Sequence, residues 1–83
     1  MSSNLMAAVL DGDWPSSAYK FVLLILAGWA NEDGFILSLD IERVAQRTGL
    51  PQDEAQDIIN DLTNSGILTA SPDQLPDGFR IVL

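Results

Sequence analysis

The uncharged run Phe21–Asn31 is the feature that most constrains how this chain can fold. It lies mostly within a helix that the periodicity predicts from about Ser17 to Ala30. One face of this helix carries apolar residues at helical spacing, namely Tyr19, Val22, Leu23, Leu26 and Ala30. Other apolar residues lie outside that face, and a helix that is apolar nearly all round must be covered on more than one side. Because the run is shorter than the roughly 20 residues of a membrane span, we expect the central helix of a soluble domain and no membrane association.

The extra apolar residues of this helix, Phe21, Leu24 and Ile25, allow two interpretations. In the first, the N-terminal residues fold over them. In the second, they form a surface for self-association, as in a homodimer, or for another partner. Residues 1–15 are predicted to be an arm rather than a core element, in which Leu5 to Leu10 suffice for one or two helical turns. The folded domain is then expected over residues 16–83.

The middle of the chain is divided by turn and cap signals. Residues 31–34 (NEDG) are turn formers that end the central helix, and a very short strand is expected at 35–37. A second helix is expected over 40–48, where Ser38 or Asp40 can cap its first turn.

The last third predicts one more helix and a hairpin. Gly49 ends the second helix, and Pro51 suits the first turn of a third helix, which continues to about Gly66. The third helix has one apolar stripe, formed by Ala55, Ile58, Ile59 and Leu62. Strands are expected at 67–70 and at 79–83, where alternation places Phe79, Ile81 and Leu83 on one face. The expected class is mainly α, with three helices and a two- or three-stranded antiparallel sheet.

The composition excludes several kinds of chemistry. The chain has 83 residues, with twelve Asp and Glu against four Lys and Arg, a net charge of -8, and neither Cys nor His. Disulfides, thiolate metal sites and the commonest general base are therefore absent, so we expect no enzyme, cofactor or metal site. The negative charge repels phosphate backbones and anionic membranes and attracts basic proteins. A cytoplasmic, intracellular protein is expected.

Three motifs follow one another between Tyr19 and Leu68. They are Ala30-Asn31-Glu32-Asp33-Gly34, then Ile41-Glu42-Arg43-Val44-Ala45 with Thr48-Gly49-Leu50, and finally Leu62 followed by Gly66-Ile67-Leu68. This pattern resembles the winged helix-turn-helix domains of phage and plasmid replication initiators and related regulators. The resemblance implies a winged helix-turn-helix fold in which helix 3 is the element that enters the DNA major groove in DNA-binding relatives.

The outward positions of helix 3 depart from that pattern because none is basic. They are Gln52, Asp53, Glu54, Gln56, Asp57, Asn60 and Asp61. The loop of the wing adds Asp73 and Asp77. Like charges four residues apart cost a few tenths of a kcal/mol per pair, so structure alone gives no reason to collect them. The alternative is a solvated face, and acids early in the helix also suit its positive end.

The acidic surface predicts a protein-binding module that engages a basic partner. Its candidate residues are Asp53, Glu54, Asp57, Asp61, Asp73 and Asp77. In its strong form, the surface imitates a phosphate backbone and inhibits a nucleic-acid-binding protein, as small acidic phage anti-host and anti-CRISPR proteins of similar size and charge do. The alternative is a DNA-binding regulator or replication-initiator domain. It would use Arg43, Arg47, Gln52 and Gln56.

Overall fold

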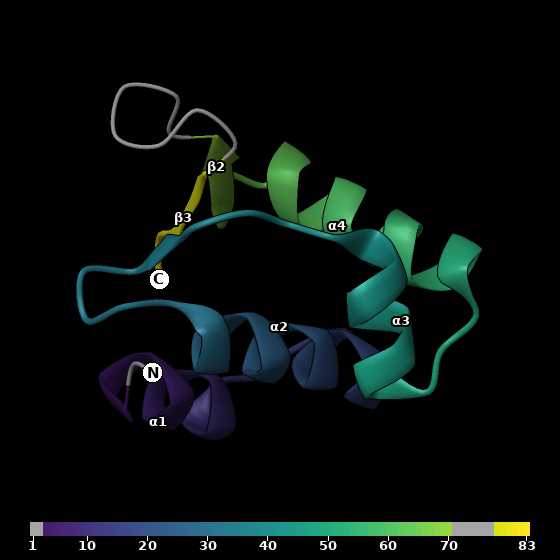
Figure 1. Ribbon diagram of the computed structural model, residues 1–83. Helices are drawn as coiled ribbons and strands as arrows, with labels where there is room; N and C mark the ends of the chain where they lie inside the picture. The colour runs from purple at the N-terminus through teal and green to yellow at the C-terminus, as the bar shows by residue number, and fades with distance from the viewer. Residues whose placement is uncertain (1–2, 71–77) are drawn as a thin grey trace.

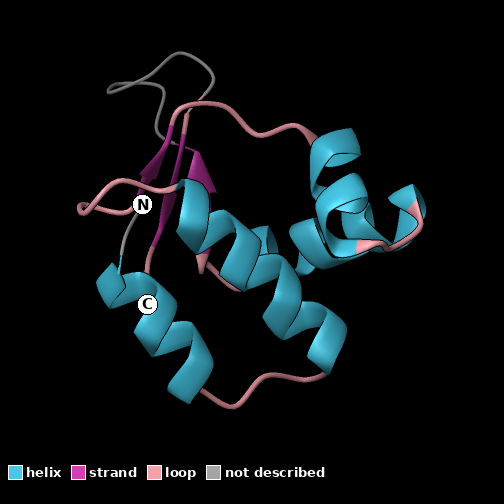
Figure 2. Ribbon diagram, turned by 60° about the horizontal axis from the view of Figure 1, so that its bottom comes forward, coloured by secondary structure: helices cyan, strands magenta, loops and turns pink. Residues whose placement is uncertain are grey.

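The computed structural model describes residues 3–70 and 78–83. Within them the chain forms four helices and three short strands. These are α1 (Ser3–Asp11), α2 (Ser17–Trp29), β1 (Phe35–Ile36), α3 (Ile41–Thr48), α4 (Gln52–Asn64), β2 (Leu68–Ala70) and β3 (Phe79–Ile81). In Figure 1, α2 runs between α1 and α4, and α3 lies across the ends of α2 and α4 that are remote from the strands. The strands lie together on one side of the helices (Figure 2).

One apolar core unites these elements. Val22, Leu23 and Leu26 of α2 are fully buried. They belong to the same cluster as Val44 of α3 and Leu62 of α4. The helix that the sequence predicts to be central therefore does lie at the centre of the domain, and its bounds differ from the expected ones by a single residue.

The N-terminal segment is a core element and not the arm that the sequence predicts. Its helix α1 packs against α2, with Val9 fully buried and Leu5 and Met6 packed on the core. The indole of Trp14 donates a hydrogen bond to the carbonyl oxygen of Val9 (2.7 Å) and stacks on Tyr19 at 6.3 Å between ring centroids. These contacts hold the end of α1 against the start of α2. The described part of the chain thus has four helices, and the expectation of three is wrong.

Side-chain oxygens cap the starts of α2 and α3. Ser16 caps α2, where its hydroxyl oxygen accepts a hydrogen bond from the backbone N–H of Tyr19 (3.1 Å). Asp40 caps α3 by accepting from the N–H of Glu42 (3.1 Å). Gly49 ends α3 in the left-handed conformation with φ +75°, as its position predicts.

The three strands form one antiparallel sheet in the order β1-β3-β2. Phe35 of β1 and Thr69 of β2 both lie opposite Arg80 of β3. The strands are shorter than predicted at their ends. β1 stops before Leu37, which is 71% exposed, and β3 stops at Ile81, so Leu83 is about half exposed instead of sharing the inner face.

Candidate functional site

Helix α4 positions the candidate acidic residues by burying its opposite side. Its apolar stripe is buried as predicted, and consists of Ala55, Ile58, Ile59 and Leu62. Pro51 precedes the first turn, and the last turn carries no basic residue. Because this stripe fixes the rotation of the helix, the residues between its members must face outward.

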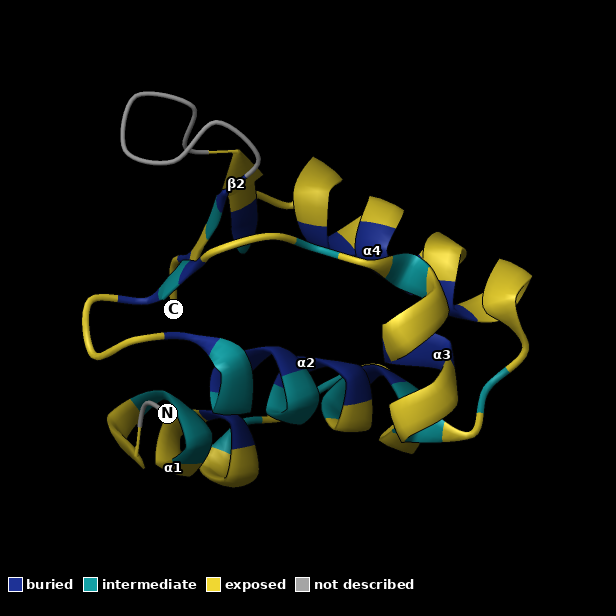
Figure 3. Cartoon of the chain, in the orientation of Figure 1, coloured by how far each residue is buried: buried dark blue, intermediate teal, exposed yellow. Residues whose placement is uncertain are grey.

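The acidic residues of α4 all lie on this outward side. Asp53, Glu54, Asp57 and Asp61 are exposed, and Figure 3 shows the outer side of α4 coloured as exposed along its length. Three of them are spaced four residues apart, so neighbouring carboxylates are separated by about 6 Å along the axis. Asp53 and Glu54 lie in the first turn, where the helix dipole favours negative charge, whereas Asp57 and Asp61 lie beyond it. We call these four residues the acidic face.

A neutral row runs beside the acidic face. The side-chain amide of Gln56 donates a hydrogen bond to Oδ1 of Asn60 (3.0 Å). Both residues are exposed, and they lie one turn apart on the same helix. The outward surface of α4 therefore consists of a carboxylate row and an amide row. The other two predicted acids, Asp73 and Asp77, lie outside the described residues.

The two arginines of α3 are not equivalent. The guanidinium of Arg43 lies over the ring of Trp29, 5.7 Å from its centroid, and this cation–π contact ties α3 to the end of α2. Arg47 follows one turn later, and both arginines are exposed. Arg43 and Arg47 are the two arginines of the DNA-binding alternative. Of these, Arg43 therefore has a structural contact inside the domain.

The remaining two cations also make contacts within the molecule. The ammonium group of Lys20 donates to the carbonyl oxygen of Leu10 (2.7 Å). Arg80 donates from Nε to the carbonyl oxygen of Asp33 (3.3 Å) and lies over the ring of Phe35 at 5.4 Å. Three of the four basic side chains therefore make contacts within their own chain, which restrict their orientation but leave their charge.

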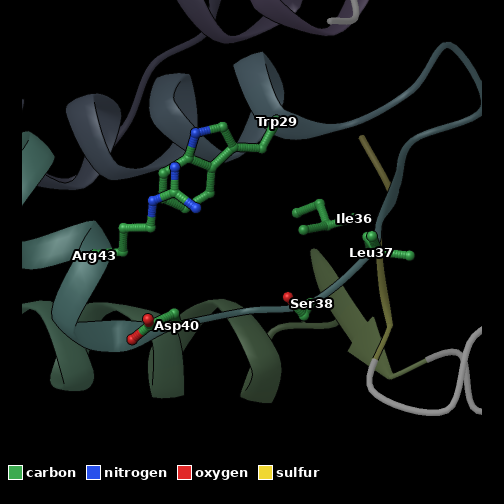
Figure 4. Close-up of a pocket in the computed structure, with 6 residues that line it drawn as sticks. All are labelled: Trp29, Ile36, Leu37, Ser38, Asp40 and Arg43. Atoms are coloured by element: carbon green, nitrogen blue, oxygen red, sulfur yellow. The ribbon is translucent and has the colours of Figure 1, made fainter.

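A pocket of about 270 Å³ opens between the end of α2, the connection after β1 and the start of α3. It is lined by Trp29, Ile36, Leu37, Ser38, Asp40 and Arg43. Figure 4 shows Arg43 extended to the ring of Trp29 on one side of the pocket and Ser38 and Asp40 on the connecting segment opposite. Its volume lies just below the range of ligand pockets, which suits a single inserted side chain better than a cofactor. This pocket could not be predicted from the sequence, because its walls come from segments that only the folded chain brings together.

The second apolar side of α2 remains partly open although α1 packs against this helix. Phe21 is 43% exposed, Ile25 is half-buried, and Leu24 is half-buried and packed on the core. Of the two interpretations, coverage by the N-terminal segment therefore holds only in part.

No helix among residues 3–70 and 78–83 is both long enough and apolar enough to cross a bilayer. In that part of the chain, no three Asp or Glu side chains gather as they would around a metal ion.

Comparison of the chain with protein families, curated proteins and solved structures finds no match.

Proposed function

We propose that this chain is a winged-helix domain that acts, without catalysis, by binding a basic protein surface through the acidic face of α4. The order of α2, β1, α3, α4 and the β2–β3 pair supports the winged-helix assignment, since it agrees with the expected sequence of a helix, a short strand, two helices and a hairpin. The helix α1 is then an N-terminal addition to that plan.

The exposure of all four acids on α4 is the observation that carries the proposal. The buried side of the same helix is ordinary, because four apolar residues pack into the core. Only the outward chemistry differs from that of a DNA-reading helix. Asp57 has a like-charged neighbour one turn away on each side, so it belongs to two repulsive pairs that the fold does not need.

In its strong form, the proposal makes the acidic face an imitation of a nucleic-acid backbone. The partner would then be a nucleic-acid-binding protein, and the domain would inhibit it by occupying its basic site. Such an inhibitor would act inside the cell that holds its target, as a phage-encoded protein acts in its host.

The test compares the native chain with the variant Asp53→Asn/Asp57→Asn/Asp61→Asn, each immobilised and exposed to host lysate. We expect the native chain to retain basic or nucleic-acid-binding proteins that the triple variant loses. The matched control is Gln56→Ala/Asn60→Ala, which alters the neutral row of the same helix and should retain those proteins. Equal retention by all three chains would refute a role for the acidic face.

Fluorescence anisotropy with duplex DNA at low salt tests the DNA-binding alternative directly. We expect no salt-sensitive binding, because Arg43 is held by Trp29 and Gln56 is bonded to Asn60. Tight binding that is lost in Arg47→Ala would replace the proposed function by DNA recognition.

A further inference from the structure

Helix α2 carries a second, outward face whose residues follow the spacing of a helix–helix contact. Phe21, Leu24, Ile25 and Gly28 are at positions i, i+3, i+4 and i+7, so they line one side of the helix. In Figure 3 the side of α2 turned toward the viewer is coloured mainly as intermediate and exposed. We call these four residues the α2 outer face.

Gly28 makes a notch at the C-terminal end of this face. A Cβ atom placed on Gly28 would meet nothing within 4 Å. The residue lies in an ordinary helical turn, where glycine is less stable than alanine. Neither the backbone nor a neighbour inside the domain requires glycine here, whereas the close approach of another molecule would.

The large residue of the same face, Phe21, lies seven residues before the notch. Phe21 is 43% exposed, and it lies about 10 Å from Gly28 along the helix axis. Next to it, Lys20 holds the carbonyl oxygen of Leu10, so the exposed end of α1 lies beside this part of the face. The α2 outer face thus has a protrusion at one end and a recess at the other.

We propose that the α2 outer face binds the same face of a second copy of this chain, forming a symmetric antiparallel dimer. A twofold axis between Leu24 and Ile25 places Phe21 of each copy in the notch at Gly28 of the other, and it pairs Leu24 with Ile25 twice. This is the reciprocal pairing that an isologous interface requires. The protrusion and the recess match because the face is complementary to itself.

The charge distribution also favours a second copy of this chain, and not a basic protein, as the partner of the α2 outer face. Helix α2 contains no acidic residue in a chain whose net charge is -8. A basic protein is attracted to the acidic regions of the surface, whereas another copy of an acidic chain meets least repulsion where acids are absent. The proposal is independent of the function assigned to α4.

Sedimentation equilibrium of the purified chain tests the dimer, together with the variants Phe21→Ala and Gly28→Phe and the two combined. We expect each single variant to raise the dissociation constant about 100-fold, because the symmetry repeats every lost contact twice. Phe21→Ala removes the protrusion, and Gly28→Phe fills the recess from a position where an added Cβ meets none of the described atoms within 4 Å. The combined variant exchanges protrusion and recess, so it should recover most of the affinity.

The matched control is Leu37→Ala, which removes another exposed apolar side chain from a different surface and should leave the dimer unchanged. Far-UV circular dichroism of each variant verifies that the domain is folded. A native chain that stays monomeric up to about 1 mM overturns the proposal. A dimer that Gly28→Phe strengthens also overturns it, since that result indicates a nonspecific apolar contact and not the reciprocal notch.

Discussion

At the scale of single residues, Gly34 shows how one backbone position joins α2 to the sheet. Its N–H donates to the carbonyl oxygen of Asn31 (3.0 Å), and its own carbonyl oxygen accepts from the N–H of Ile81 (2.9 Å). The side chain of Asn31 closes the same turn by accepting from the N–H groups of Asp33 and Phe35. Gly34 has φ +88°, and a Cβ there would lie 2.8 Å from the carbonyl oxygen of Ile81. Both the conformation and the contact therefore exclude a side chain.

We expect Gly34→Ala to lower the free energy of unfolding by about 2–3 kcal/mol, since it combines left-handed strain with a backbone clash. Gly49→Ala is the matched control. It has a similar φ of +75° but no atom within 4 Å of the added Cβ, so it should cost only about 1–2 kcal/mol. Urea unfolding of both variants measures the difference. Equal losses would show that the contact with Ile81 contributes nothing.

At the scale of elements, helix α1 allows a test of whether the N-terminal segment is a loose arm or part of the core. If it were a loose arm, substitutions along it would change stability little. In the structure Val9 is fully buried in the core, whereas the neighbouring Leu10 is 54% exposed. The two residues therefore make an internal comparison within one helix.

We expect Val9→Ala to lower the free energy of unfolding by about 1.5–3 kcal/mol, from two lost methyl groups and the cavity that they leave. Leu10→Ala removes more apolar atoms but should change it by less than about 0.5 kcal/mol, as is usual for exposed positions. Thermal or urea unfolding measures both. If the two variants are equally stable, α1 is not part of the cooperative core.

The same helix shows where sequence reasoning fails. The helices α2 and α3 could be predicted to within a residue because Ser16, Asp40 and Gly49 give local cap and stop signals. Helix α1 spans nine residues without an acidic first turn or a basic last turn, so local signals do not distinguish it from a frayed arm. Its stability comes from contacts outside the helix, namely the burial of Val9 in the core and the bond from Trp14 to the carbonyl oxygen of Val9, which propensity cannot reveal.

The candidate sites also contain some features that the sequence could predict and others that it could not. The exposure of Asp53, Asp57 and Asp61 could be predicted, because the apolar stripe of α4 fixes which side of the helix faces water. The contact of Arg43 with Trp29 could not, since it joins two helices whose crossing the sequence does not specify. The spacing of Phe21 and Gly28 is visible in the sequence, but the open space at the glycine is not.

At the scale of the whole molecule, the two proposed surfaces are separated by the core. Helices α2 and α4 both turn their apolar stripes toward it, so the acidic face and the α2 outer face point away from each other. A dimer formed through α2 would leave both acidic faces free. One assembly could then present two acidic faces to two basic sites, and the second binding event would gain from the first if the geometry of the target permits it.

The two surfaces should differ in their response to salt. Raising NaCl from about 0.1 M to 1 M shortens the screening length from about 10 Å to about 3 Å. Retention of basic proteins by the acidic face should then weaken by about tenfold or more, because it depends on exposed charge. Dimerisation should become stronger or stay unchanged, because two copies of net charge -8 repel each other less while the apolar contact persists. Sedimentation equilibrium and retention assays across the same salt series measure both effects. A dimer that dissociates in parallel with the loss of basic partners would place its contacts among the charged residues and not on α2.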